Sequence, residues 1–258
     1  MRIGVSALHL LGNPFQSLVN AIQSYGVKAW ELVDEDTLGI NKRRARVLNE
    51  LRRTFSLEYV VHAPFADINL ATFNPEIRRV VTRRLTKSIE HASLIEAKLW
   101  VFHPGLRSGL SAIYPNKDWQ LNIDSIELLL ENAENNGVRI LIENMPDPFQ
   151  FLLKTPEDFE RLYKSIQSEK LGIAFDIGHA NTVNKIPEFL EKHGCRIAHI
   201  HAHDNSGSFD HHRKIGQGTV DWSLLKSKLA QVEYEGYVIV ESMEEIPESL
   251  EKLRSLLG

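Results

Sequence analysis

The sequence is poor in the features that mark several classes of protein. Its 258 residues include one cysteine, Cys195, so an internal disulfide is excluded and a disulfide-stabilised scaffold is not expected. The uncharged stretch 3–27 is interrupted by polar residues such as Asn13, Gln16 and Asn20 and does not have the continuous apolarity of a bilayer span. The N-terminal residues show no signal-peptide pattern. We therefore expect a cytoplasmic protein without a membrane segment.

The sequence also has no excess of positive charge. Thirty Lys and Arg residues stand against thirty-four Asp and Glu residues, which gives a net charge of −4. General attraction to nucleic acid or to an acidic membrane is therefore not implied, and any contact with nucleic acid must be a local patch. Neither a G-x-G-x-x-G motif after the first predicted strand nor a G-x-x-x-x-G-K-[ST] motif occurs, so a nucleotide cradle is not expected. Nothing in the composition indicates an obligate protein partner.

Short apolar runs alternate with longer segments whose apolar residues return every three or four positions, which is the pattern of repeated βα units. The predicted strands are Ile3 to Ser6, Ala29 to Val33, Leu57 to His62, Leu99 to His103, Val138 to Glu143, Leu171 to Asp176, Ile197 to His201 and Tyr237 to Glu241. Eight such units with no flexible linker predict a single α/β domain over residues 1–258, a (β/α)8 TIM barrel. An open doubly wound sheet is the alternative.

Ionisable side chains end six of these predicted strands. The residues are His62, His103, Glu143, Asp176, His201 and Glu241, and three more lie just beyond strand ends, namely His179, Asp210 and His212. The carboxyl ends of barrel strands converge on one mouth, so we expect these nine side chains to share a cavity. Imidazole and carboxylate ligands suit Zn²⁺ or Mn²⁺, and nine of them could hold up to three ions.

Each of these residues taken alone is more often a hydrogen-bonded histidine or a salt-bridge partner than a ligand. Their joint placement favours metal binding, because ionisable groups inside a barrel mouth are costly to desolvate unless they are paired or metal-bound. His199 lies deeper in the same strand as His201, and we interpret it as a hydrogen-bonded interior residue. His203 and His211 flank predicted ligands and could replace them in this assignment.

These residues lie in segments that resemble the xylose-isomerase-like TIM barrels, and within them endonuclease IV. The segments are VHAPFADINLA (61–71), VFHPG (101–105), IEN (142–144), DIGH (176–179), HIHAHDNSGSFDHHRKIGQG (199–218) and VIVES (238–242). Sugar isomerases and epimerases of the superfamily keep a one-metal core, which corresponds here to Glu143, Asp176, His201 and Glu241. The endonuclease IV pattern implies a trinuclear zinc centre whose further ligands correspond to His62, His103, His179, Asp210 and His212.

The resemblance implies two alternative functions. The first is a zinc-dependent phosphodiester hydrolase that incises DNA on the 5′ side of abasic sites, with Glu143 bridging two ions. The second is a sugar or sugar-phosphate isomerase or epimerase that uses Mn²⁺ or Mg²⁺, with Glu143 and Glu241 as the catalytic pair that transfers the proton. The chain departs from endonuclease IV in the segment after the second strand, which reads DEDTLGINKRR in place of an aromatic and Arg-containing loop. DIGH also replaces the usual DTCH.

Two features are candidate substrate contacts. Phe65 stands where endonuclease IV commonly has a tyrosine, and it can still stack on a base or sugar. Lys42, Arg43 and Arg44 begin the helix predicted after the second strand, where the helix dipole disfavours cations and favours an anion. We predict a phosphate contact there, with a solvated helix face as the alternative. The later arginine run 78–84 is expected to cover the outer surface.

Overall fold

The computed structural model describes residues 1–257 and contains a closed barrel of eight parallel strands in the order β1 to β8. The strands are β1 (Arg2–Ser6), β2 (Ala29–Val33), β3 (Glu58–His62), β4 (Leu99–Phe102), β5 (Arg139–Glu143), β6 (Leu171–Asp176), β7 (Ile197–Ala202) and β8 (Tyr237–Val240). β1 pairs with β8 and closes the cylinder. The predicted (β/α)8 architecture is confirmed, and the open-sheet alternative is wrong.

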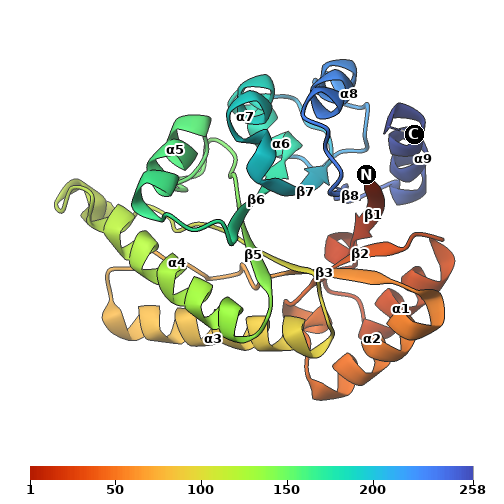
Figure 1. The fold of residues 1–258 in the computed structure, drawn as a ribbon, viewed down its shortest axis with the longest axis horizontal. Helices are drawn as coiled ribbons and strands as arrows, with labels where there is room; N and C mark the ends of the chain where they lie inside the picture. Colours follow the sequence, from red (N-terminus) through yellow and green to blue (C-terminus); the bar gives the residue numbers. More distant parts are fainter. Residues whose placement is uncertain (258) are drawn as a thin grey trace.

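Helices surround the strands and cover the outside of the barrel (Figure 1). They are α1 (Phe15–Ser24), α2 (Lys42–Phe55), α3 (Pro75–Leu94), α4 (Lys117–Asn135), α5 (Pro156–Ser165), α6 (Ile177–Thr182), α7 (Ile186–His193), α8 (Trp222–Gln231) and α9 (Ile246–Leu257). Four short 3-10 helices lie in the connections, η1 (Ala7–Leu10), η2 (Asp36–Leu38), η3 (Gly109–Ala112) and η4 (Gly194–Arg196). No described helix is long and apolar enough to cross a membrane.

Capping side chains explain where several helices begin. The Asn41 side-chain oxygen accepts hydrogen bonds from the backbone N–H groups of Arg43 and Arg44 at the start of α2, and Asn74 caps α3 in the same way. Thr155 and Asp158 form a reciprocal capping box at α5. These caps fix the helix starts beside the carboxyl ends of the strands.

The core has two parts, and the inner part explains the position of the ionisable residues. A large cluster packs the strands against the helices, whereas a smaller one is built from strand residues and fills the barrel interior. The interior cluster includes Val60, Val101, Leu141, Ala174 and Ile239. Successive strand residues point to opposite faces, so the residue two positions later points inward as well. Those later residues are His62, His103, Glu143, Asp176 and Glu241.

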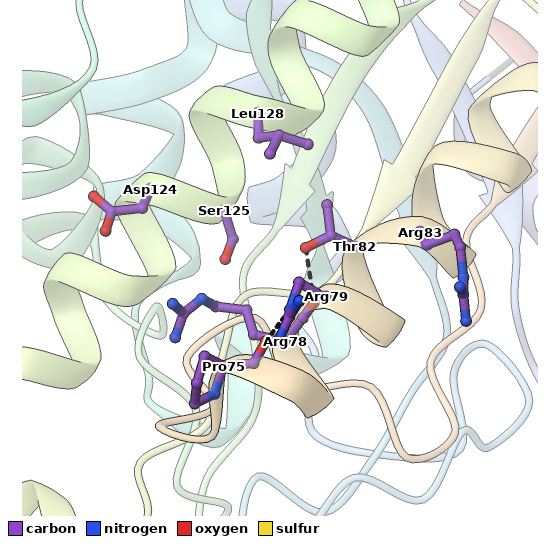
Figure 2. A pocket seen from close by; sticks show the side chains of 8 residues that line it. All are labelled: Pro75, Arg78, Arg79, Thr82, Arg83, Asp124, Ser125 and Leu128. Carbon is purple, nitrogen blue, oxygen red and sulfur yellow. Dashed lines mark hydrogen bonds between the residues drawn. The ribbon is translucent and has the colours of Figure 1, made fainter.

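A surface pocket of about 500 Å³ lies between α3 and α4, outside the barrel (Figure 2). Two of its arginines use backbone acceptors: Arg78 donates to the carbonyl of Thr72, and Arg79 donates to that of Pro75. Arg84, in the same sequence run, is on the outer helix α3 and also contacts the barrel, because its guanidinium lies 3.2 Å from the buried carboxylate of Asp34. The pocket is separate from the convergent strand ends.

Candidate metal centre

The nine predicted ligands lie in three adjoining groups at the carboxyl end of the barrel. We call Glu143, Asp176, His201 and Glu241 the inner group, because all four side chains are buried. The His62 group consists of His62, His103 and Glu143, and the outer group consists of His179, His203, Asp210 and His212. Within each group, one candidate ligand atom per residue lies within 4.8 Å of the others. That these residues bind ions stays a prediction.

The spacing of atoms in the first two groups fits a metal ion better than a set of hydrogen bonds. Nitrogen or oxygen ligands around a tetrahedral zinc lie about 3.3 Å apart. His201 Nδ1 lies 3.1 Å from Glu143 Oε1, 3.6 Å from Asp176 Oδ2 and 3.4 Å from Glu241 Oε2. Glu143 Oε2 lies 3.4 Å from His62 Nε2 and 3.2 Å from His103 Nε2. The two oxygens of Glu143 thus face different groups, as a bridging carboxylate requires.

Hydrogen bonds to the backbone orient three of the histidines. Nδ1 of His62 donates to the carbonyl of Ala63, that of His179 to Asn144, and that of His212 to Glu241, at 2.8, 2.8 and 2.9 Å. A carbonyl accepts but does not donate, so each Nδ1 carries a hydrogen and each Nε2 faces the carboxylates. Partners on the far side of the ring are typical of metal-ligating histidines.

Glu31 on β2 is a residue of this site that the sequence reasoning missed. Its Oε2 atom lies 2.9 Å from His201 Nε2 and 2.7 Å from His199 Nε2, and its Oε1 accepts a hydrogen bond from Ser6 at 2.9 Å. The contact with His201 is a hydrogen bond, whereas His199 Nε2 lies close to Glu31 without forming one. Glu31 holds the His201 ring with Nδ1 toward the inner group. His199 is buried in the interior, as expected, but neither of its ring nitrogens has a hydrogen-bond partner.

The carboxylates of the inner group are buried close together, and this affects their pKa values. Burial raises the pKa of Glu241, and the nearby carboxylates of Glu31 and Glu143 add to this effect against the opposing charge of His201, giving a pKa of about 7. Burial also opposes ionisation of Glu143, but its imidazole neighbours, His201 first, hold its pKa well below the usual range. Glu143 Oε2 is buried without a hydrogen-bond partner. Crowded carboxylates and an unpartnered oxygen fit a divalent cation.

The histidines respond to the same carboxylates in two ways. Burial lowers the pKa of His62, but the close Glu143 carboxylate and the carboxylates of Glu31 and Glu241 outweigh burial and raise it to about 9. For His179 of the outer group, the carboxylates of Asp176 and Asp210 outweigh burial and raise the pKa to about 10. Burial prevails for His103 and His203 and lowers their pKa values. In the metal-free protein, His62 and His179 are therefore protonated at neutral pH, and a bound ion would replace these protons.

The groups open into a cavity of about 410 Å³ at the barrel mouth. Its lining residues are Leu8, His62, Phe65, His103, Leu106, Glu143, Met145, Pro146, Phe149, Phe151, His179, Asp210, His212 and Glu241. Phe65 therefore lies beside the candidate metal centre, with its ring 5.5 Å from that of His62. The lining described here contains no lysine or arginine.

The three predicted phosphate contacts are absent from this lining. Lys42 and Arg43 are exposed at the start of α2. Arg44 donates to the carbonyl of Gly39 and lies 5.0 Å from the centre of the Phe15 ring. A contact between these residues and a phosphate stays a prediction that the cavity geometry does not favour.

Residues 19–256 match the family model of the xylose isomerase-like TIM barrel. The chain belongs to this family. An uncharacterized protein of Methanocaldococcus jannaschii, MJ1311, is 37% identical over 245 residues, which cover 94% of this chain and 84% of the relative. The crystal structure of a D-tagatose 3-epimerase-like protein superposes with a TM-score of 0.94 at 35% identity and covers 100% of this chain and 97% of that one.

A more distant relative is named for the other predicted function. The probable endonuclease 4 of Thermoplasma volcanium is 26% identical over 195 residues, which cover 70% of this chain and 66% of that protein. The family therefore contains relatives named for sugar epimerisation and for DNA cleavage, and members of both kinds are enzymes that the fold alone does not separate.

Proposed function

We propose that the chain is a divalent-metal-dependent isomerase or epimerase of a small hydroxy-ketone sugar. The observation that carries the proposal is the inner group at the base of the mouth cavity, with three carboxylates and one imidazole. Oxygen-rich sites of this kind suit Mn²⁺ or Mg²⁺. A cavity of about 410 Å³ admits a monosaccharide, and its lining contains neither lysine nor arginine, the side chains that most often bind a phosphate.

The chemistry follows from two carboxylates that share one substrate site. An ion bound by the inner group would polarise the carbonyl and hydroxyl oxygens of the sugar. Glu143 and Glu241 both line the cavity and supply two candidate proton-transfer groups. One carboxylate takes the proton from the carbon beside the carbonyl, and the other returns a proton to the opposite face, which inverts that carbon.

The comparisons support this choice over the alternative. The epimerase-like structure is similar over the whole chain, whereas the endonuclease relative aligns over about two thirds of its own length. The net charge of −4 also provides no general electrostatic attraction to nucleic acid, whereas a neutral sugar does not need one.

A proton-exchange assay tests the proposal directly. D-tagatose and a panel of other ketohexoses and ketopentoses are incubated with the protein and Mn²⁺ in D₂O and followed by NMR. We expect deuterium at the carbon beside the carbonyl and a new epimer for at least one sugar. Glu143→Gln and Glu241→Gln should each abolish both signals. Absence of exchange for every sugar with Mn²⁺, Mg²⁺, Co²⁺ and Zn²⁺ would overturn the proposal.

The phosphodiester hydrolase is the second candidate, and one observation favours it. The His62 group and the outer group adjoin the inner group, so the chain contains the full set of residues that a trinuclear centre needs. Clustered ions are typical of enzymes that displace groups at phosphorus. An oligonucleotide with one abasic analogue provides the test. A nick that chelator prevents and that His103→Ala reduces would favour the hydrolase over the epimerase.

A further inference from the structure

The outer group contains one side chain more than the three ligands that the resemblance implies. His203, just after β7, is fully buried, and its Nδ1 atom has no hydrogen-bond partner. Oδ1 of Asp210 is also buried without a partner, and the two atoms lie 3.7 Å apart. We propose that His203 is the fourth protein ligand of a closed Zn²⁺ site that it forms with His179, Asp210 and His212. The inference does not depend on the reaction proposed above.

The contacts of His203 select Nδ1 as its ligand atom. Its Nε2 lies 3.1 Å from both carboxylate oxygens of Asp176. An ionised carboxylate accepts but does not donate, so Nε2 carries the hydrogen and Nδ1 has the lone pair. A carboxylate behind a histidine ring is a common support for a metal ligand. Because Asp176 belongs to the inner group, this hydrogen bond connects the two groups directly.

The other three members of the outer group converge on the same place. His179 Nε2 lies 3.1 Å from Asp210 Oδ2, and His212 Nε2 lies 2.9 Å from the same oxygen. Both rings are fixed from behind by their Nδ1 hydrogen bonds to backbone carbonyls. Three imidazoles and one carboxylate form a nitrogen-rich set that suits Zn²⁺, in contrast to the oxygen-rich inner group.

The backbone makes specific room for the His203 ring. A Cβ atom at Gly178, in α6, would lie 2.0 Å from Cε1 of His203. On its other side, the His203 ring stacks on that of His212, with centroids 3.9 Å apart, so one of the two rings must tilt for both nitrogens to bind the same ion. A buried ring nitrogen without a hydrogen-bond partner lowers the stability of the folded protein unless something binds that nitrogen. The absence of a side chain at Gly178, the glycine of the DIGH segment, therefore leaves the space that the His203 ring occupies.

A four-ligand site has a structural consequence for the mouth. Zinc ions with four protein ligands are typically structural, because no coordination position is left for water or substrate. Asp210 and His212 belong to the long connection after β7, whereas His179 belongs to α6. The ion would fasten this connection to α6 and form part of the cavity wall, and chemistry would be left to the inner group and the His62 group.

The variant His203→Gln separates a ligand from a positioning residue. The glutamine amide can still donate to Asp176, but it has no lone pair at the position of Nδ1. Metal-free protein is titrated with Zn²⁺ against a chromophoric chelator, without sugar or DNA. We expect His203→Gln to weaken one site at least tenfold, and Asp210→Asn to weaken the same site without a further loss in the double variant. His211→Gln, which changes the exposed neighbour, should leave every site unchanged.

Co²⁺ provides a second readout, because a four-coordinate site with three imidazoles absorbs strongly in the visible range. His203→Gln should change the position and intensity of this band, whereas His211→Gln should not. Unchanged Zn²⁺ affinity and an unchanged Co²⁺ band in His203→Gln would overturn the proposal. Loss of affinity in His203→Ala alone would also overturn it, because it would assign His203 only to the support of Asp176. If His203→Ala does not fold, the glutamine variant still decides the question.

Discussion

Replacing Glu31 with glutamine tests how the interior of the barrel controls the candidate metal centre. Glu31 is completely buried and contacts both His199 and His201 through one oxygen. Glutamine has nearly the same shape but no negative charge, so even with its amide oxygen toward the imidazoles it accepts the Nε2–H of His201 more weakly than the carboxylate does. The contact that keeps Nδ1 toward Glu143, Asp176 and Glu241 is then weakened.

The expected size of this effect follows from the contacts. Loss of a partner behind a metal-ligating histidine typically costs about 10–100-fold in metal affinity, or about 1.4–2.7 kcal/mol. The fold should also be destabilised, by about 3–5 kcal/mol, because the buried imidazoles lose their carboxylate. Metal affinity is measured by chelator competition with Mn²⁺ at pH 7, and stability by thermal unfolding of the metal-free protein.

Asp34→Asn is the matched control for Glu31→Gln. Asp34 follows the same strand and is equally buried, but its carboxylate contacts Arg84 and the backbone N–H of Ile40 on the outside of the barrel. We expect this variant to lose stability and to retain its Mn²⁺ affinity within twofold. Equal Mn²⁺ affinity in Glu31→Gln and the wild type would refute the reasoning, because it would show that Glu31 does not orient His201.

Four further outcomes are expected from the geometry. His62→Ala and His103→Ala should each remove the same ion, because both rings face Glu143 Oε2, and elemental analysis after dialysis would contradict this if neither variant lost metal. The apparent Zn²⁺ affinity of the outer group should rise by up to about 100-fold per pH unit near neutrality, because an ion must displace protons from His179 and His212. Nearby carboxylates outweigh burial and raise the pKa values of these two histidines to about 10 and about 9. A Zn²⁺ affinity that does not depend on pH would refute this. These raised pKa values also stabilise the metal-free protein below about pH 6.5, and this contribution is lost as the pH rises through about 9, so its Tm should fall over that range. Lys42→Gln combined with Arg43→Gln should leave sugar turnover within twofold of the wild type, since neither residue lines the cavity, and a larger loss in a steady-state assay would assign these cations a substrate contact.

Much of the site could be predicted because strand geometry places residues at a spacing of two on one face. Val60 and His62, or Leu141 and Glu143, share this spacing, so an apolar strand that ends in an ionisable residue indicates an inward-facing ligand. The same rule extends to Glu31, which lies two residues after the interior Ala29. Glu31 lies in the middle of β2, so an ionisable residue at the end of a strand does not indicate it.

Other features depend on contacts that spacing does not encode. His203 follows His199 and His201 with the same period, but its pairing with Asp210 depends on how the connection after β7 folds back. Arg84 belongs to a charged helical run, and only the packing of α3 against the end of β2 shows that it pairs with the buried Asp34. Local patterns predicted which residues face the mouth, whereas the partners that loops and helices bring were set by tertiary packing.

The central claim is that the buried carboxylates and imidazoles at the barrel mouth are held together by divalent ions. The most direct measurement is a crystal structure of the protein grown with Mn²⁺ and Zn²⁺, with anomalous scattering recorded at the absorption edge of each metal. We expect one peak among Glu143, Asp176, His201 and Glu241, and a zinc peak among His179, His203, Asp210 and His212. Density for water alone at both positions, with the side chains hydrogen-bonded to one another, would contradict the claim.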